Sequence, residues 1–169
     1  LLDDEEAQST IREIRSAVKI LSANKIGALL VIERDMGLND ISATGIQIDG
    51  LITSDFLMNV FIPNTPLHDG AAVIRGKRLI AAGCLLPLTE NRTLSTELGT
   101  RHRAAIGLSE QCDALVVVVS EETGTISIAE NGRIHRHLDG DQLTHILSPA
   151  FAYNARSSIW EFVRSWRKK

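Results

Sequence analysis

Asp113-Ala114-Leu115-Val116-Val117-Val118-Val119-Ser120 is the stretch of this 169-residue chain that says most about its fold. Four consecutive valines favour the pleated backbone, and an apolar run without alternation is typical of a strand that is buried on both faces. The run from Ala28 to Ile32 is equally apolar and has the length of a strand. We therefore expect a single globular α/β domain, in which a mixed central β-sheet is flanked by helices.

The flanking segments supply the other elements of this fold. Helices are predicted where apolar residues recur three or four apart, namely over 3–24, in a segment capped by Thr53 or Ser54, over 100–108 and in a segment capped by Asp141. Further strands are predicted over 45–50, 71–74, 79–86 and 125–129, the last of them followed by the hairpin signal Asn131-Gly132. A helical tail is expected to pack on the core or on a partner, because helical spacing recurs at Ile159, Val163 and Trp166.

The composition is that of an ordinary soluble globular protein. Hydrophobic residues make up 44% of the chain and charged residues 23%, and the formal net charge is −3. This balance gives no general affinity for polyanions, so any phosphate chemistry must come from a local site. Cys84 and Cys112 lie in or beside apolar runs and form no Cys-x-x-Cys pair, which favours reduced, buried thiols in a cytosolic compartment. No apolar stretch reaches the roughly 18 residues of a membrane span.

The segment that opens the helix before the valine strand has an unusual charge pattern. Thr100 is a good N-cap, yet Arg101 and Arg103 follow it, although a helix N-terminus itself carries partial positive charge. Free N–H groups, the helix dipole and arginine side chains would together attract an anion, and phosphate is the obvious candidate. The alternative is that both arginines bend into solvent or pair with Glu97 or Glu110.

A second polar segment, His68-Asp69-Gly70-Ala71, lies at the start of the strand predicted over 71–74. Glycine and alanine leave room for a ligand to approach the backbone beside Asp69, whereas the plainer interpretation of Asp-Gly is a turn before a strand. The acidic segment Ser120-Glu121-Glu122 follows the valine strand, and by itself it is best interpreted as a solvent-facing turn.

Taken together, Leu67-His68-Asp69-Gly70-Ala71 and Gly99-Thr100-Arg101-His102-Arg103 closely resemble the two signature motifs of diadenylate cyclases, the DGA and RHR motifs of the DAC domain. The resemblance extends to Cys84-Leu85-Leu86-Pro87, Ser95-Thr96-Glu97-Leu98-Gly99 and Ser120-Glu121-Glu122-Thr123-Gly124, and so covers about residues 26–138. Within the family the chain is most similar to the membrane-anchored CdaA type. The resemblance implies one DAC domain over 1–169, with an N-terminal helix before the core and a helical tail after it. Because the cyclase domain of the CdaA type follows N-terminal transmembrane helices, the resemblance also implies a transmembrane anchor that precedes this chain in the full-length protein.

The resemblance further implies a reaction, in which two ATP molecules condense to cyclic di-AMP with release of two pyrophosphates, assisted by Mg²⁺ or Mn²⁺. It assigns catalysis to Asp69, Gly70 and Ala71. It assigns ATP binding to Leu86, Thr100, Arg101, His102, Arg103, Ser120, Glu121 and Glu122. Metal binding would fall to Asp69, His68 and Glu122. Because a carboxylate is a weak base for a ribose hydroxyl, we expect Asp69 to act through the metal.

The partners that follow are ATP as substrate, cyclic di-AMP as product, a second copy of the domain and regulatory proteins, with no nucleic acid. The second copy follows from symmetry: the product has two equivalent linkages, whereas the chain has one Asp-Gly-Ala and one Arg-His-Arg motif, hence one ATP site. The full-length protein is expected at the cytoplasmic face of the cell membrane, with the present chain soluble. Two other classes stay open: a non-catalytic nucleotide sensor that would not need Asp69, and an interaction domain that docks through the basic tail from Arg164 to Lys169.

Overall fold

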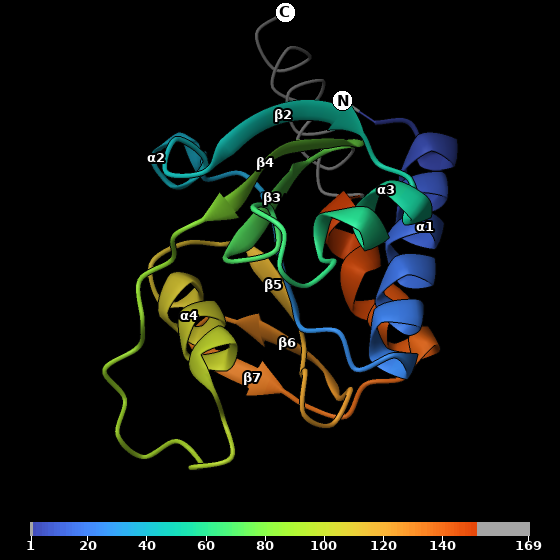
Figure 1. Cartoon of the computed structure of the whole chain (residues 1–169). Coiled ribbons are helices and arrows are strands. Elements are labelled where there is room, and N and C mark those ends of the chain that lie inside the picture. The colour runs from blue at the N-terminus through green and yellow to red at the C-terminus, as the bar shows by residue number, and fades with distance from the viewer. Residues whose placement is uncertain (1, 152–169) are drawn as a thin grey trace, which may run out of the picture.

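The structure, a computed structural model, describes residues 2–151 (Figure 1). Within that range the helices are α1 (Asp4–Ala23), α2 (Asn39–Ser42), α3 (Ser54–Val60) and α4 (Thr100–Ser109), and a further helix begins at residue 140 and continues to residue 151. The strands are β1 (Ala28–Ile32), β2 (Ile46–Leu51), β3 (Ala71–Arg75), β4 (Arg78–Cys84), β5 (Leu115–Val119), β6 (Ile126–Glu130) and β7 (Arg133–His135).

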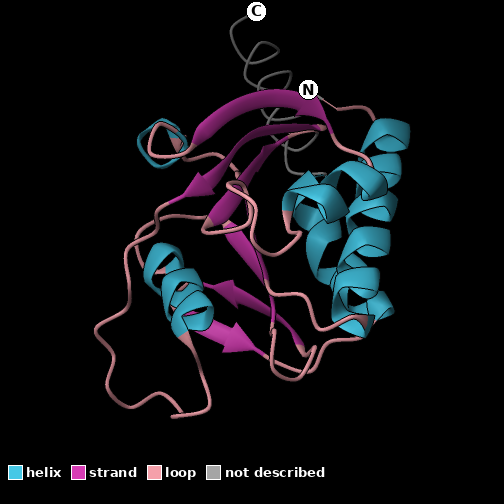
Figure 2. Cartoon of the chain, in the orientation of Figure 1, coloured by secondary structure: helices cyan, strands magenta, loops and turns pink. Residues whose placement is uncertain are grey.

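These strands form one mixed sheet in the order β2-β4-β3-β1-β5-β6-β7. The central strand β1 runs parallel to β3, with Leu30 opposite Ala72, and antiparallel to β5, with Leu30 opposite Val117. The other neighbouring strands are antiparallel. Figure 2 shows α1, α3 and the last helix on one side of the sheet and α4 on the other. The expected α/β fold, a mixed sheet flanked by helices, is confirmed.

β1 and β5 are buried along their whole length, as their unbroken apolar runs predict. Successive side chains of β1 enter two different cores: Leu30 belongs to the core that includes α1 and α3, and Leu29 to the core that includes α4. In β5, Val117 and Val118 divide between the two cores in the same way. Full burial of one such side chain is worth about 1.5–3 kcal/mol, so these two strands bind the helical layers together.

Local sequence explains where the first helices begin. The Asp3 carboxylate accepts a hydrogen bond from the Glu6 N–H at 2.7 Å, and the Glu6 carboxylate accepts one from the Asp3 N–H, a capping box at the start of α1. The predicted apolar face of α1 is buried at Ile11, Ile14, Val18 and Leu21. Thr53 caps α3, because its hydroxyl oxygen accepts from the Phe56 N–H at 3.1 Å.

Two predicted boundaries near the cleft described below are wrong. Thr100 is the first residue of α4 and not its N-cap, because Gly99 takes the extended N-cap conformation, and no side chain caps this helix. Strand β4 ends at Cys84 instead of Leu86. Here the Leu85 N–H donates to the Thr44 hydroxyl oxygen at 2.9 Å, so the chain has left the strand ladder.

The cap of the last helix also differs from the prediction. Asp139, and not Asp141, caps it: the Asp139 carboxylate accepts from the Gln142 N–H at 2.8 Å, and the Gln142 side chain accepts from the Asp139 N–H at 2.9 Å. Asp141 instead forms an ion pair with Arg15 of α1 at 3.1 Å. The predicted tail helix, with Ile159, Val163 and Trp166, lies outside the described residues. Among residues 2–151, no helix has the length and apolarity that crossing a bilayer requires.

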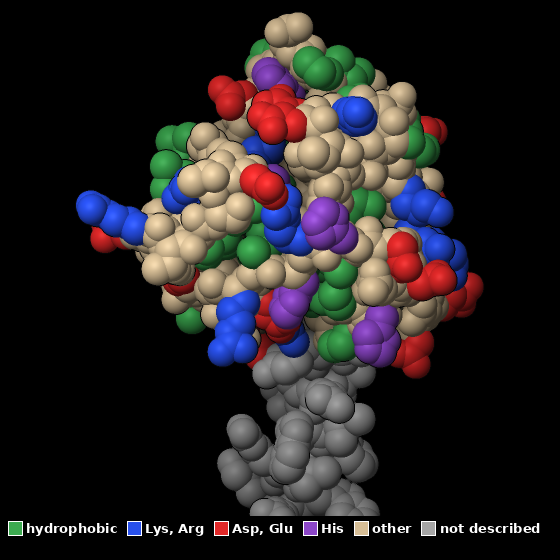
Figure 3. All heavy atoms as spheres, turned by 90° about the horizontal axis from the view of Figure 1, so that it is seen from below, with side chains coloured by type: hydrophobic (Ala, Val, Ile, Leu, Met, Phe, Trp, Pro, Cys, Tyr) green, Lys and Arg blue, Asp and Glu red, His purple; other side chains and the backbone are tan. Residues whose placement is uncertain are grey.

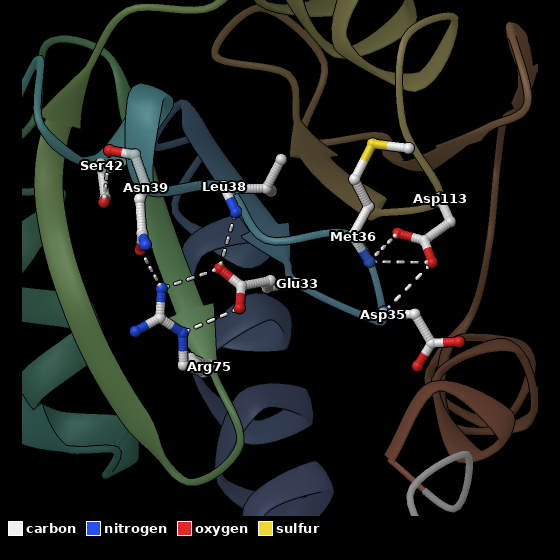
Figure 4. Close-up of polar contacts among 8 residues, drawn as sticks. All are labelled: Glu33, Asp35, Met36, Leu38, Asn39, Ser42, Arg75 and Asp113. Atoms are coloured by element: carbon white, nitrogen blue, oxygen red, sulfur yellow. Dashed lines mark hydrogen bonds and ion pairs between the residues drawn. The ribbon is translucent and has the colours of Figure 1, made fainter. Parts of the chain in front are cut away.

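Polar contacts fix the connection between β1 and α2 (Figure 4). The Arg75 guanidinium donates to both carboxylate oxygens of Glu33, at 2.8 and 3.1 Å, and to the side-chain oxygen of Asn39 in α2 at 2.7 Å. Asp113 accepts from the two backbone N–H groups at 35–36. The two-pronged pairing of Arg75 with Glu33, together with its bond to Asn39, holds α2 in place. Thr44, just after α2, is thereby kept beside the end of β4.

Candidate functional site

A cleft of about 690 Å³ lies at one edge of the sheet. The strand directions explain its position. Because β1 and β3 are parallel to each other and antiparallel to β5 and β4, the starts of β1 and β3 meet the ends of β4 and β5 at this edge, with Ala28 opposite Val119 and Ala71 opposite Cys84. The N-terminal end of α4 and the turn after β5 point toward the same lower side in Figure 1. Figure 3 views that side, where basic, acidic and histidine side chains are interspersed.

The cleft brings together most of the residues predicted from sequence. Its lining includes Asp69, Gly70, Leu86, Thr100, Arg101, His102, Ser120, Glu121 and Glu122. Three predicted residues, His68, Ala71 and Arg103, are not part of the lining. Ala71 is fully buried in β3, in the core that includes α4, whereas His68 and Arg103 are half-buried. Segments more than fifty residues apart in sequence, at Asp69 and Glu122, thus face one space.

The N-terminus of α4 presents backbone donors to the cleft. The first intrahelical bond runs from the Arg103 N–H to the Gly99 carbonyl at 3.1 Å, so the N–H groups of residues 100–102 have no acceptor within the helix. No side chain caps this end. Free donors and the positive end of the helix dipole make it suited to an anion.

Arg101 places a cation beside these donors. Its Nη1 lies 3.4 Å from the Glu121 carboxylate, and its guanidinium rests against the α-carbon of Gly27, just before β1. The two alternative partners considered from sequence are engaged elsewhere, because Glu97 pairs with Arg136 at 3.4 Å and Glu110 accepts a hydrogen bond from the Thr89 hydroxyl. Arg101 therefore stays at the cleft.

His102, the next residue of α4, is buried at 6% exposure, and its Nε2 has no hydrogen-bond partner among the described residues. Burial lowers the pKa of this imidazole, and the charges of Arg136 and Arg101 lower it further. His102 is consequently neutral at pH 7, with one ring nitrogen left for a ligand or water at the cleft.

Asp69 and Gly70 line the cleft just before the start of β3. Asp69 is exposed. Gly70 has a φ of +120°, and a Cβ built there would lie 2.6 Å from the Cys84 carbonyl oxygen. Both the conformation and the contact with β4 therefore require glycine, a reason additional to the predicted approach of a ligand.

The carboxylates of the cleft do not form a ready-made metal cage. Among residues 2–151, no three His, Cys, Asp or Glu side chains gather closely enough to hold an ion, so Asp69, His68 and Glu122 make no such group. The His68 Nδ1 is bonded to the Thr65 carbonyl instead. Asp69 nevertheless fits a divalent ion of the Mg²⁺ kind, because such ions are often bound by one or two carboxylates together with phosphate oxygens of the substrate.

An apolar rim continues the wall beyond β4. Leu85 and Leu88 are 69% and 55% exposed, and both line the cleft together with Leu86. Two large exposed apolar side chains at the mouth of a polar cleft suit a flat, partly apolar ligand group. Leu86 was among the residues predicted to bind ATP, whereas Gly27, which the structure places against Arg101, was not among the predicted site residues.

The family comparison fits this geometry. The chain matches the family DAC, described as DisA bacterial checkpoint controller nucleotide-binding, over residues 15–134. This chain belongs to the DAC family. The match of the DAC domain includes both signature motifs and every described residue of the cleft lining.

Similar proteins support the assignment to the DAC family. The chain is 48% identical over 169 residues to the cyclic di-AMP synthase CdaA of Bacillus subtilis, and this match covers 98% of the chain and 60% of that protein. It is 44% identical over 144 residues to a diadenylate cyclase of Listeria monocytogenes, covering 85% of the chain and 53% of that protein. The DAC domain described here therefore spans little more than half the length of these relatives.

A solved structure has the same fold. The crystal structure of a double mutant of DacA from Staphylococcus aureus superposes on this DAC domain with a TM-score of 0.85 at 42% identity. The superposition covers 88% of this chain and 99% of that one. The likeness confirms the α/β fold and family expected from the sequence.

Proposed function

We propose that this chain is a diadenylate cyclase, which condenses two ATP molecules into cyclic di-AMP and releases two pyrophosphates. The observation that carries the proposal is one cleft that is lined by Asp69, by the uncapped N-terminus of α4 and by Arg101. The names of the two relatives, a cyclic di-AMP synthase and a diadenylate cyclase, support the same reaction.

The triphosphate of ATP binds at the N-terminus of α4. The free N–H groups of residues 100–102 and the Arg101 guanidinium donate to phosphate oxygens, and neutral His102 contributes a ring nitrogen. Arg103 lies outside the cleft lining, so within one chain we assign it a supporting role. The adenine lies against the apolar rim at Leu86, where backbone groups read its edge.

The reaction joins two such nucleotides. The 3′-hydroxyl oxygen of one ATP forms a bond to the α-phosphorus of the other, the bond from that phosphorus to pyrophosphate breaks, and the hydroxyl proton leaves. Holding the two groups in line and neutralising the charge that develops supply most of the catalysis. Asp69 holds the 3′-hydroxyl of the attacking ATP in place. Gly70 and Ala71 keep the backbone beside it close to β4.

Nucleotidyl transfer of this kind needs a divalent ion, and we propose Mg²⁺ or Mn²⁺. Asp69 would hold it together with phosphate oxygens of the substrate. Glu122, which lines the same cleft, is a further candidate ligand, whereas His68 lies outside the lining. The ion would supply positive charge at the reacting phosphate and favour loss of the hydroxyl proton. Ser120 supports this side, because its hydroxyl accepts from the Glu122 N–H at 3.2 Å and so shapes the acidic turn. Glu121 would reach the substrate through the divalent ion, since a carboxylate cannot itself pair with phosphate.

Closing the ring requires two chains. Residues 2–151 of one chain form one such cleft, with one Asp69 and one Arg101, whereas cyclic di-AMP has two equivalent linkages. Two clefts facing each other across a two-fold axis would set each 3′-hydroxyl against the other α-phosphate. Regulatory proteins are further partners on this proposal, and nucleic acid is not. In the full-length protein we place the domain at the cytoplasmic face of the cell membrane, following its similarity to the CdaA type.

The test is direct. The purified chain is incubated with ATP and Mn²⁺, and the products are separated by chromatography, with an Asp69→Asn variant as the control. We expect cyclic di-AMP and pyrophosphate in a one-to-two ratio from the wild-type chain alone. ATP binding without any cyclic di-AMP would favour the nucleotide sensor instead, and the absence of both would leave an interaction domain.

A further inference from the structure

The residue that precedes β1, Gly27, contacts the guanidinium of Arg101. A Cβ built on Gly27 would lie 2.5 Å from Cζ and 3.0 Å from Nη2 of Arg101, and it would also overlap Nη1. Arg101 thus occupies the space in which any other residue would carry its side chain. The two residues are more than seventy positions apart in sequence.

If Gly27 were replaced by a larger residue, the Arg101 side chain would move and the backbone of β1 would not. The strand that begins at Ala28 is fully buried and is paired on both sides, by β3 and β5, so it has no room to shift. The guanidinium is the far end of a flexible side chain that is 26% exposed at the cleft. Gly27 has no positive φ, so alanine is compatible with its backbone conformation.

We propose that Gly27 is a positioning residue, which sets where the Arg101 guanidinium lies in the cleft. This inference rests on the proposed function, in which Arg101 binds the triphosphate. An alanine at this position would push the cation away from the start of β1, while Asp69 and the helix N-terminus stay in place. Because a misplacement of about 1 Å can cost on the order of a hundredfold in rate, a single methyl group is enough to matter.

The test compares Gly27→Ala with a matched control, Gly37→Ala. Gly37 lies between β1 and α2 and has no neighbouring heavy atom within 4 Å of a built Cβ, and it too lacks a positive φ. Thermal unfolding, equilibrium binding of ATP and cyclic di-AMP formation are measured for both. We expect both variants to melt as the wild type does, and only Gly27→Ala to lose ATP affinity and kcat/KM, the latter by roughly tenfold or more.

A double-mutant cycle with Arg101→Ala separates positioning from a general structural role. If Gly27 acts through Arg101, Gly27→Ala will have no further effect on ATP binding once the guanidinium is absent. Three results would each overturn the inference: wild-type behaviour of Gly27→Ala, an undiminished effect in the Arg101→Ala background, or a lowered melting temperature, which would mean that the strand has moved. If no chain makes cyclic di-AMP but ATP still binds, the proposed function fails while the binding cycle still decides the role of Gly27.

Discussion

Nη1 of Arg101 lies 3.4 Å from Oε2 of Glu121, so the cation that we assign to the triphosphate is paired with a carboxylate before any substrate arrives. The Glu121 side chain is 66% exposed, and such solvent-screened ion pairs are worth about 0–1 kcal/mol. A triphosphate with several negative charges can therefore replace Glu121. The ion pair with Glu121 orients Arg101 in the cleft, but it is too weak to prevent Arg101 from binding the triphosphate.

Glu121→Gln should change the affinity for ATP in opposite directions with and without a divalent ion. In EDTA the variant should bind ATP roughly two- to fivefold more tightly, because a competitor for Arg101 and a repelling charge are both gone. In Mn²⁺ the variant should bind ATP more weakly than the wild type does, because Glu121 would then reach the substrate through the Mn²⁺ ion. Calorimetry of ATP binding under both conditions checks this, with exposed Glu90→Gln as control. Weaker binding in EDTA would contradict the competition between Glu121 and phosphate.

Asp69→Asn should abolish cyclic di-AMP formation while ATP binding stays within about tenfold, a difference of roughly 1.4 kcal/mol. Asp69 is exposed at the cleft, so we expect no loss of stability. Product analysis and ATP titration of the same preparation give both quantities, and Asp40→Asn, exposed on α2, serves as the matched control. Retained turnover in Asp69→Asn would rule out its proposed role.

Replacing Arg101 and Arg103 with alanine should weaken ATP binding and leave the melting temperature of the free chain unchanged or slightly higher. Positive charges at a helix N-terminus oppose the dipole by about 0.3–1 kcal/mol, and this gain offsets the lost ion pair. Of the single variants, Arg101→Ala should lose more affinity, since only Arg101 lines the cleft. A large drop in melting temperature would identify the arginines as structural.

His102 should make stability depend on pH. Because burial lowers its pKa in the folded chain, the unfolded chain binds the extra proton first, as pH falls below about 6.5. Stability is thus lost on acidification through that window and regained as pH rises. The free energy of unfolding, measured in urea at several pH values between 5 and 8, should depend less steeply on pH for His102→Gln than for the wild type.

Two variants check the origin of this pH dependence. Arg136→Gln should reduce the slope in part, because the Arg136 charge contributes to the lowered pKa of His102. His135→Gln, at an exposed position, should retain the full slope. Equal slopes for His102→Gln and the wild type would show that another group titrates.

Specific activity should rise with enzyme concentration and then level off. Each chain contributes one proposed ATP site, so the rate depends on the encounter of two chains, and we expect that encounter to be weak in dilute solution. The initial rate per milligram is measured over a hundredfold dilution at saturating ATP and Mn²⁺, alongside the oligomeric state. A flat profile from a chain that is monomeric throughout would contradict the face-to-face mechanism, whereas a flat profile from a stable dimer would contradict only the weak association.

The sequence alone determined those elements whose pattern is local. The valine run of β5, the apolar run of β1 and the three- or four-residue apolar spacing of α1 each carry their own signal, because unbroken strand burial and helix amphipathicity are both visible within a short stretch of sequence. The caps at Thr100 and Asp141 were wrong by one or two residues. At the last helix both Asp139 and Asp141 could serve as the cap, and at α4 no side chain caps the start, so only the backbone path decides where each helix begins.

The two motifs could likewise be found from sequence, but their assembly into one cleft was decided by the tertiary structure. Strand directions bring Asp69, Arg101 and Glu122 to the same edge of the sheet, while His68 and Arg103 stay outside the lining despite lying in the motifs. Nothing in the sequence pairs Gly27 with Arg101 either. Contacts between distant segments depend on the register and crossing of whole elements, and those are set by the packing of β1 between the two cores.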